Sequence, residues 1–258
     1  MSSVIRKRDL VRVGLRSFFI QASWNYERML GLGWAFALMP ILHRLKVHGE
    51  ARKAFLRRHL GFFNATPFVS SFALGTVAKL EEEASEQRPN DERRPSARSE
   101  NRTDHIERIK VALSGPLSSV GDRLFWHGFR PMAALLGVAS MVLWGGWGVL
   151  VFLVAFNLPH LVFRFYGVVQ GHRLGLEIAR EFSRPLYERV IRWTERVGAF
   201  GLGLLIGIKS FGDPPNHWTT PTILFLSMGL GFLLLRRGIS PALPFVLVLI
   251  AGIGAIWI

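Results

Sequence analysis

Three short stretches of the chain place polar and ionisable side chains inside otherwise apolar sequence. The first reads QASWNYERMLGLG (residues 21–33), the second HLGFFNATPF (59–68) and the third GPLSSVGDRLFW (115–126). We call them polar segments 1, 2 and 3. Such groups cost several kcal/mol to bury unless they are paired, and membrane proteins tend to keep them for a purpose. Their hydrogen-bonding side chains are therefore the candidates for function.

Seven side chains of these segments are donors, acceptors or aromatic rings of the kind that recognise a polar substrate. A site built from buried polar groups discriminates strongly, because the wrong ligand leaves those groups unpaired. The candidates for lining a substrate path are Gln21, Asn25, Glu27, Asn64, Thr66, Asp122 and Trp126. A structural role is the alternative: Glu27 then pairs with Arg28, and Asn64 or Asp122 caps a half-helix.

The sequence around the polar segments predicts helices embedded in a membrane. Asp, Glu, Lys and Arg are absent from residues 131–163, 214–235 and 238–258. About 20 apolar residues suffice for a helix to cross the hydrocarbon core. Residues 61–78 are uncharged but hold Asn, Thr, Pro and Ser, which favours a broken or re-entrant helix that lines a cavity. We therefore expect an all-α polytopic membrane protein with broken or re-entrant helices and a flexible cytoplasmic linker.

The net charge of +14 is spread along the chain and does not form one basic stripe. Residues 1–16 carry five cations and one acid, and residues 41–60 carry six cations and one acid. Basic residues thus flank apolar segments, as the positive-inside bias produces on the cytoplasmic side of a bacterial inner membrane. This distribution argues against nucleic-acid binding and favours attraction to anionic lipid headgroups. The basic N-terminus is expected to form an amphipathic helix in the headgroup region.

Four regions are expected along the chain: a membrane-embedded region with polar motifs (1–80), a charged flexible linker (81–104), a core membrane region (105–196) and C-terminal transmembrane helices (197–258). In the first region, glycines near Gly31 interrupt the helical pattern and Pro40 is expected to end it. The linker is rich in charge, Pro and Ser, so it lacks the apolar surface needed to order itself.

The third region is expected to restart as a helix at residue 105, with Asp104 as N-cap. Residues 131–163 are too long for one span at about 1.5 Å per residue. The sequence WGGWG (144–148) therefore predicts two helices joined by a tight turn, and Pro185 is expected to interrupt the amphipathic pattern that follows. The last region holds three short apolar segments, at 197–211, 221–235 and 240–258.

The sequence carries no pattern typical of catalysis or of a bound cofactor. It contains no cysteine, so disulfides and thiolate metal sites are excluded. The spacings of His43, His48 and His59 do not reproduce a metal-binding pair with a carboxylate, and their cationic neighbours disfavour a metal. Phosphate-binding loops, nucleophile elbows and kinase signatures are missing as well. We expect no cofactor and no metal.

Taken together, the three polar segments resemble the IID membrane subunit of the mannose/fructose/sorbose family of the sugar phosphotransferase system, from about Leu10 to Arg196. The resemblance implies that the chain forms, with a IIC membrane subunit, the path for uptake of a mannose-like hexose. It also implies coupling to phosphorylation by a soluble IIB partner, and a trimer of IIC–IID pairs. Because the phosphate relay of this family runs on soluble partners, the resemblance implies a non-catalytic subunit without a phosphorylation site.

One position departs from the family pattern. A small residue is expected after the GD of polar segment 3, where this chain has Arg123. A cation there could neutralise Asp122 and impair transport. Together with the Arg-rich linker, this leaves open a regulatory or scaffolding membrane protein that retains the fold without transporting. A weaker alternative is a basic peripheral protein that acts on anionic lipids.

Overall fold

The computed structural model describes residues 3–86, 97–182 and 185–212, without side chains for 97–103 and 199–212. These residues are helical apart from turns, bends and two isolated bridges. The elements are α1 (Lys7–Arg16), η1 (Ser17–Phe19), α2 (Gly31–Arg44), α3 (Gly49–Leu60), α4 (Ser70–Glu86), α5 (Ala97–Gly121), η2 (Asp122–Phe129), α6 (Arg130–Trp144), α7 (Trp147–Leu174), η3 (Gly175–Glu177), α8 (Ile178–Phe182) and α9 (Pro185–Gly212). Residues up to Gly198 form one compact unit, described below, and residues 199–258 form a second.

The predicted all-α fold is confirmed, and the first helical region is interrupted directly before Gly31. Residues 20–30 form turns between η1 and α2, and Gly31 begins α2. Pro40 lies inside α2, which continues to Arg44, so the predicted end at Pro40 is wrong. A proline cannot donate to the carbonyl four residues earlier. Here Arg16 Nη1 donates to the Phe36 carbonyl instead, at 3.3 Å, which helps α2 to continue through Pro40.

The linker predicted over 81–104 is shorter in the structure. Helix α4 extends to Glu86, and α5 already begins at Ala97, so Asp104 lies inside a helix and is not its N-cap. Within α4, Glu81 and Glu82 are buried. Glu82 accepts hydrogen bonds from the backbone N–H of Ile5 at 2.8 Å and from His172 Nε2 at 3.0 Å. The remaining linker residues, 87–96, lie outside the described residues.

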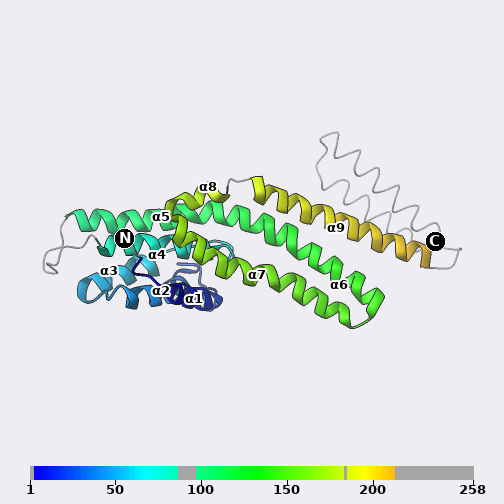
Figure 1. Cartoon of the computed structure of the whole chain (residues 1–258), viewed down its shortest axis with the longest axis horizontal. Coiled ribbons are helices and arrows are strands. Elements are labelled where there is room, and N and C mark those ends of the chain that lie inside the picture. Colours follow the sequence, from blue (N-terminus) through cyan, green and yellow to red (C-terminus); the bar gives the residue numbers. More distant parts are fainter. Residues whose placement is uncertain (1–2, 87–96, 183–184, 213–258) are drawn as a thin grey trace. The chain divides into compact units, whose positions relative to one another are not determined.

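The uncharged run 131–163 forms two helices, as predicted. Helices α6 and α7 are joined by the turn at WGGWG, where Gly145 has a φ of +59°. Figure 1 shows them as an antiparallel hairpin. Within the described residues, one stretch, Trp147–Phe182, is long and apolar enough to cross a membrane, with mean hydropathy 1.8 and 17% of its apolar window buried. Large apolar side chains are exposed along both helices, which suits contact with lipid.

Glycines allow α7 to pack closely against α4. A Cβ on Gly171 would overlap the Phe72 carbonyl, and a Cβ on Gly75 would overlap the Val168 carbonyl. Small residues at a helix crossing let two backbones approach, which is a common device where the surroundings are lipid. Residues 70–78 of α4 are buried throughout. Helix α4 is therefore a central element of the unit, and it fixes the position of the loop that precedes it.

The C-terminal region is described only in part. Pro185 is the first residue of α9, where its missing N–H is tolerated, so the predicted interruption falls at a helix start. Helix α9 includes the first of the three predicted apolar segments, 197–211. The other two, 221–235 and 240–258, lie outside the described residues.

Candidate functional site

Polar segments 2 and 3 meet directly in the structure. Segment 2 comprises the last two residues of α3 and most of the connection to α4, and segment 3 comprises the end of α5 and the start of the π-helical η2. The buried Thr66 hydroxyl donates to Asp122 Oδ1 at 2.6 Å, across 56 residues of sequence. The exposed Asp122 carboxylate is thereby held in one orientation. π-helical turns are rare and frequently occur at functional sites, so this junction is the first candidate for the site.

Two serines of α5 fix the backbone of polar segment 2. Ser114 Oγ and Ser118 Oγ both donate to the Asn64 carbonyl, the latter at 3.4 Å. Ser114 and Ser118 are four residues apart and therefore lie on the same face of the helix. These bonds thus fix the backbone of Asn64, while Asn64 as a whole is exposed to solvent. An anchored backbone with an exposed amide suits recognition of a polar ligand.

Polar segment 1 joins this cluster through its backbone. The N–H of Leu30 donates to the Phe63 carbonyl at 2.9 Å, and the N–H of Phe63 donates to the Arg28 carbonyl at 3.4 Å. Segments 1 and 2 therefore lie side by side, and segment 2 lies between the other two. The three polar segments, separated in sequence, therefore meet around the connection between α3 and α4.

Within polar segment 1, two candidates make local contacts. Asn25 Oδ1 accepts the N–H groups of Glu27 and Arg28, at 3.1 and 2.8 Å, and so closes the turn. Glu27 forms an ion pair with Arg28 at 3.4 Å, and both side chains are largely exposed. Gln21 is exposed in the preceding turn, and none of the contacts described for it reaches segments 2 or 3.

Trp126 lies in η2, four residues after Asp122. It is 46% exposed, and the guanidinium of Arg130 lies over its ring at 5.1 Å. Because tryptophan carries both an apolar face and a polar edge, an exposed ring of this kind suits stacking on a polar ring-shaped ligand. Of the predicted residues, Thr66 and Asp122 are in direct contact, Asn64 lies on the same connection as Thr66, and Trp126 lies in the same π-helical element as Asp122.

Arg123 does not neutralise Asp122, contrary to the possibility drawn from the sequence. Its guanidinium makes two hydrogen bonds to Glu188 of α9, at 2.7 and 3.1 Å. These bonds raise the pKa of Arg123 and lower the pKa of Glu188. Asp122 instead accepts the hydroxyl of Thr66. One of the two observations in favour of a non-transporting scaffold, a cation that neutralises Asp122, is thereby removed.

A buried ion pair beneath polar segment 2 holds α3 against α4. Arg58 donates to both carboxylate oxygens of Glu81, from Nε at 2.6 Å and Nη2 at 2.7 Å. His59 Nε2 lies 2.9 Å from Glu81 Oε1, and Trp34 Nε1 donates to His59 Nδ1 at 3.4 Å. Because an indole N–H is only a donor, Nδ1 must accept. His59 is therefore neutral, with its proton on Nε2.

The pKa values of this cluster agree with that assignment. Burial lowers the pKa of His59 to about 4, although Glu81 opposes the shift. Burial alone would raise the pKa of Glu81, but hydrogen bonds from His59 and Arg58 outweigh it and lower the pKa to about 2. At neutral pH the cluster is thus a carboxylate paired with one guanidinium and one neutral imidazole.

Lys110 caps the end of α3 where polar segment 2 begins. Its ammonium group is buried and donates to the carbonyls of Arg58 at 3.0 Å, His59 at 3.4 Å and Gly61 at 2.9 Å. These include the last carbonyls of a helix, which carry partial negative charge and lack partners within the helix. Burial lowers the pKa of Lys110 to about 8, so the group is still mainly protonated at neutral pH.

Sequence reasoning missed several residues that position the site. Ser114 and Ser118 could have been found from their i, i+4 spacing at the edge of polar segment 3. Glu81 and Lys110 carry no comparable signal, because their partners lie 22 to 52 residues away. Within the described residues, no group of three or more His, Cys, Asp or Glu side chains could hold a metal ion.

Comparison with known proteins identifies the chain. The family model for the "PTS system mannose/fructose/sorbose family IID component" matches residues 4–209. The chain belongs to this family of IID components. The relatives include the mannose-specific EIID component of Escherichia coli K12, which is 36% identical over 216 residues, covering 83% of this chain and 69% of the relative. The sorbose-specific EIID component of Lacticaseibacillus casei is 31% identical over 280 residues, covering 100% of this chain and 95% of the relative.

Two solved structures share the fold of this IID component. One is the cryo-EM structure of the mannose transporter ManYZ in complex with microcin E492. Its TM-score is 0.59 and its identity 30%, and the match covers 97% of this chain and 96% of the solved chain. The other is described as the structure of a membrane protein, with a TM-score of 0.67, 32% identity and coverage of 96% of both chains. The family predicted from the three polar segments is confirmed. This IID component is a membrane protein of a mannose-family sugar permease.

Proposed function

We propose that polar segments 1 to 3 form the part of the sugar path that this IID component contributes. The observation that supports the proposal is the convergence of the three segments on the loop between α3 and α4. Its exposed polar groups are presented by a rigid base: the two serines hold Asn64, Thr66 holds Asp122 and Lys110 fixes the start of the loop. Preorganised groups lose less entropy on binding a ligand.

Each residue has a role suited to a hexose with several hydroxyl groups. The amide of Asn64 can both donate to and accept from a hydroxyl, whereas the Asp122 carboxylate accepts. The ring of Trp126 provides an apolar face for the sugar ring. Thr66 acts through Asp122 as a positioning residue. Asn25 and Glu27 have local structural bonds and supply the rim of the path together with Gln21.

The path is completed by a IIC subunit, which packs against the exposed polar and aromatic residues of segments 1 and 3. The similarity to the structure of the mannose transporter ManYZ supports this arrangement. Trp24 and Tyr26 are exposed at 45% and 85%, and tryptophan and tyrosine are enriched at protein interfaces. The complex is a trimer of IIC–IID pairs in the bacterial inner membrane, which this chain crosses several times.

Transport is coupled to chemistry that takes place on another protein. A phosphorylated IIB protein docks on the cytoplasmic surface of the complex and phosphorylates the hexose as it arrives. This IID component takes no part in the phosphoryl transfer and carries no phosphorylation site. Its contribution is the alternating access of the broken-helix unit formed by segment 2 and α4, which rocks about the fixed site.

Uptake measurements with single variants test the assignment. Asn64→Ala and Asp122→Ala should each abolish hexose uptake in cells, while the tagged chain still recovers a IIC subunit and a IIB protein in a detergent pull-down read by mass spectrometry. Glu50→Ala serves as a control, because Glu50 is exposed on α3 and pairs only locally with Lys53. Normal uptake in both site variants would refute the assignment. Failure to recover any partner would refute the complex.

A further inference from the structure

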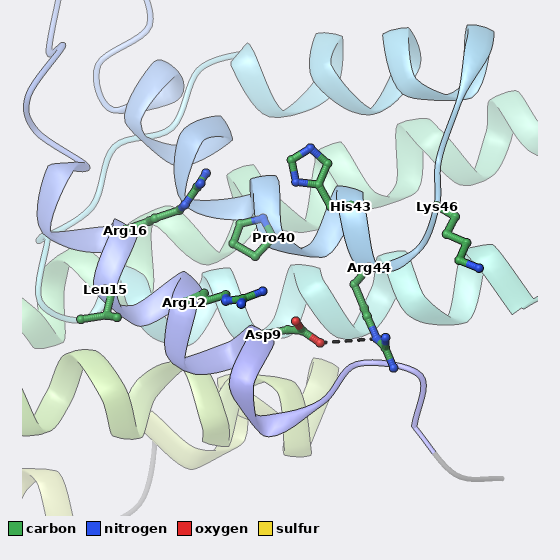
Figure 2. Close-up of a pocket in the computed structure, with 8 residues that line it drawn as sticks. All are labelled: Asp9, Arg12, Leu15, Arg16, Pro40, His43, Arg44 and Lys46. Atoms are coloured by element: carbon green, nitrogen blue, oxygen red, sulfur yellow. Dashed lines mark ion pairs between the residues drawn. The ribbon is translucent and has the colours of Figure 1, made fainter.

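A groove lies between α1 and the C-terminal half of α2, and none of its lining residues belongs to the three polar segments. Its volume is about 590 Å³. Figure 2 shows the side chains that line it. They are Asp9, Arg12, Leu15, Arg16, Pro40, His43, Arg44 and Lys46. The groove is therefore lined by four cationic side chains and one carboxylate.

The carboxylate of Asp9 is already paired with groups of the protein. Asp9 lies 3.5 Å from Arg44 and also accepts the backbone N–H of Arg6 at 3.0 Å. Arg44 in turn donates to the Val4 carbonyl at 2.7 Å. This pair neutralises itself, so Arg12, Arg16 and Lys46 give the groove its net positive charge. Arg12 and Lys46 are exposed residues and are available to an anion.

Exposed apolar side chains lie next to the groove. Leu15 of its lining is 53% exposed, and Phe19 and Phe36 are exposed at 59% and 42%. These two rings contact each other edge to face at 6.1 Å. Arg16 lies at the boundary, with its guanidinium 4.7 Å from the centre of the Phe36 ring. The surface thus changes from cationic to aromatic along α1, η1 and α2.

We propose that this groove binds the phosphate of an anionic phospholipid, with the acyl chains over Phe19 and Phe36. A cationic groove next to exposed aromatic rings matches a molecule that joins a phosphate to hydrocarbon chains. A free phosphate would use only the cationic half of this surface. The planar guanidinium of Arg12 matches a phosphate in geometry, and Lys46 contributes a point charge. The site is independent of the proposed sugar path.

The bound lipid fixes the α1–α2 hairpin at the membrane surface. Helix α1 packs on α7 near Phe165, close to the Phe18 ring, which is 6.3 Å from that of Phe165. Because α7 belongs to the stretch that can cross the membrane, α1 and its groove lie beside a membrane-crossing element. A headgroup bound there would hold α1 at a fixed depth in the interface.

Native mass spectrometry of the purified complex tests the proposal. The probes are phosphatidylglycerol, phosphatidylcholine and inorganic phosphate, each titrated onto the delipidated complex. The groove variant is Arg12→Gln combined with Lys46→Gln. The control is Arg52→Gln combined with Lys53→Gln, which removes the same charge from exposed positions of α3. All four residues are exposed, and recovery of the intact complex verifies folding.

Phosphatidylglycerol should bind the unmodified complex and the control equally, and phosphatidylcholine should bind weakly to both. Loss of two cations near the headgroup should weaken phosphatidylglycerol binding to the groove variant about 30-fold. Equal binding to the groove variant and the control would overturn the proposal. Displacement of phosphatidylglycerol by millimolar inorganic phosphate would also overturn it, because the groove would then be a site for free phosphate.

Discussion

Removing the carboxylate of Glu81 should destabilise the protein far more than removing the carboxylate of the exposed Glu83. Glu81 is fully buried and is the anionic partner of Arg58, whose side chain is 5% exposed. Glu81→Leu leaves that guanidinium buried without a counter-charge, which costs about 3–5 kcal/mol. For a protein of this size, each kcal/mol shifts the unfolding midpoint by roughly 2–4 °C, so the midpoint should fall by roughly 6–20 °C.

Glu83→Leu is the matched control, because it removes a glutamate two residues along the same helix. The Glu83 side chain is 50% exposed and lies 3.9 Å from Lys79. A surface pair of this kind contributes about 0–1 kcal/mol. The assay is thermal unfolding of protein purified from membranes in detergent. Adding Arg58→Met to Glu81→Leu should restore most of the lost stability, since the unpaired charge is then gone.

The reasoning fails if Glu81→Leu lowers the midpoint no more than Glu83→Leu does. It also fails if adding Arg58→Met lowers the midpoint further, because the two residues would then stabilise the fold separately. Either result would mean that the ion pair does not hold α3 to α4, and that polar segment 2 is positioned by other contacts.

Three further predictions concern pH and packing. The pKa of His59 is about 4 in the fold against 6.5 ordinarily, so the unfolded chain binds more protons between these values. The unfolding midpoint should fall as pH is lowered from 6.5 toward 4, and less so in His59→Gln. Gly171→Ala should prevent normal packing of α7 on α4, because its methyl group overlaps the Phe72 carbonyl; intact folding would disprove that contact. His160→Leu should leave the midpoint unchanged or raise it, since Nε2 has no hydrogen-bond partner in the described structure.

The sequence predicts those parts of the fold that depend on local composition. The long uncharged run and its WGGWG turn predict the α6–α7 hairpin, because span length and glycine turns follow from neighbouring residues. The predicted linker is too long because its first residues are ordered by contacts that are distant in the sequence. Its acidic start looks solvated, yet Glu81 and Glu82 are buried through partners 22 to 90 residues away. Local composition does not contain such contacts.

For the candidate site too, the sequence predicts the residue types but not the contacts between them. Residue types and apolar surroundings identify Asn64, Asp122 and Trp126 as candidates, but not which of them meet. The Thr66–Asp122 bond spans 56 residues, and Arg123 is turned toward Glu188, 65 residues away. The sequence also groups Asn25 and Glu27 with the other candidates, whereas in the structure Asn25 closes a turn and Glu27 pairs with the adjacent Arg28.

The most direct test of the central proposal is protection of polar segment 2 by sugar. The chain contains no cysteine, so Phe62→Cys introduces a single thiol two residues before Asn64, at a position that is 45% exposed. Lys53→Cys on α3 is the control, with a side chain that is 70% exposed. In membranes that contain the complex, the transported hexose should slow maleimide labelling of Phe62→Cys and leave Lys53→Cys unaffected. Equal labelling of Phe62→Cys with and without sugar would contradict the assignment of segment 2 to the sugar path.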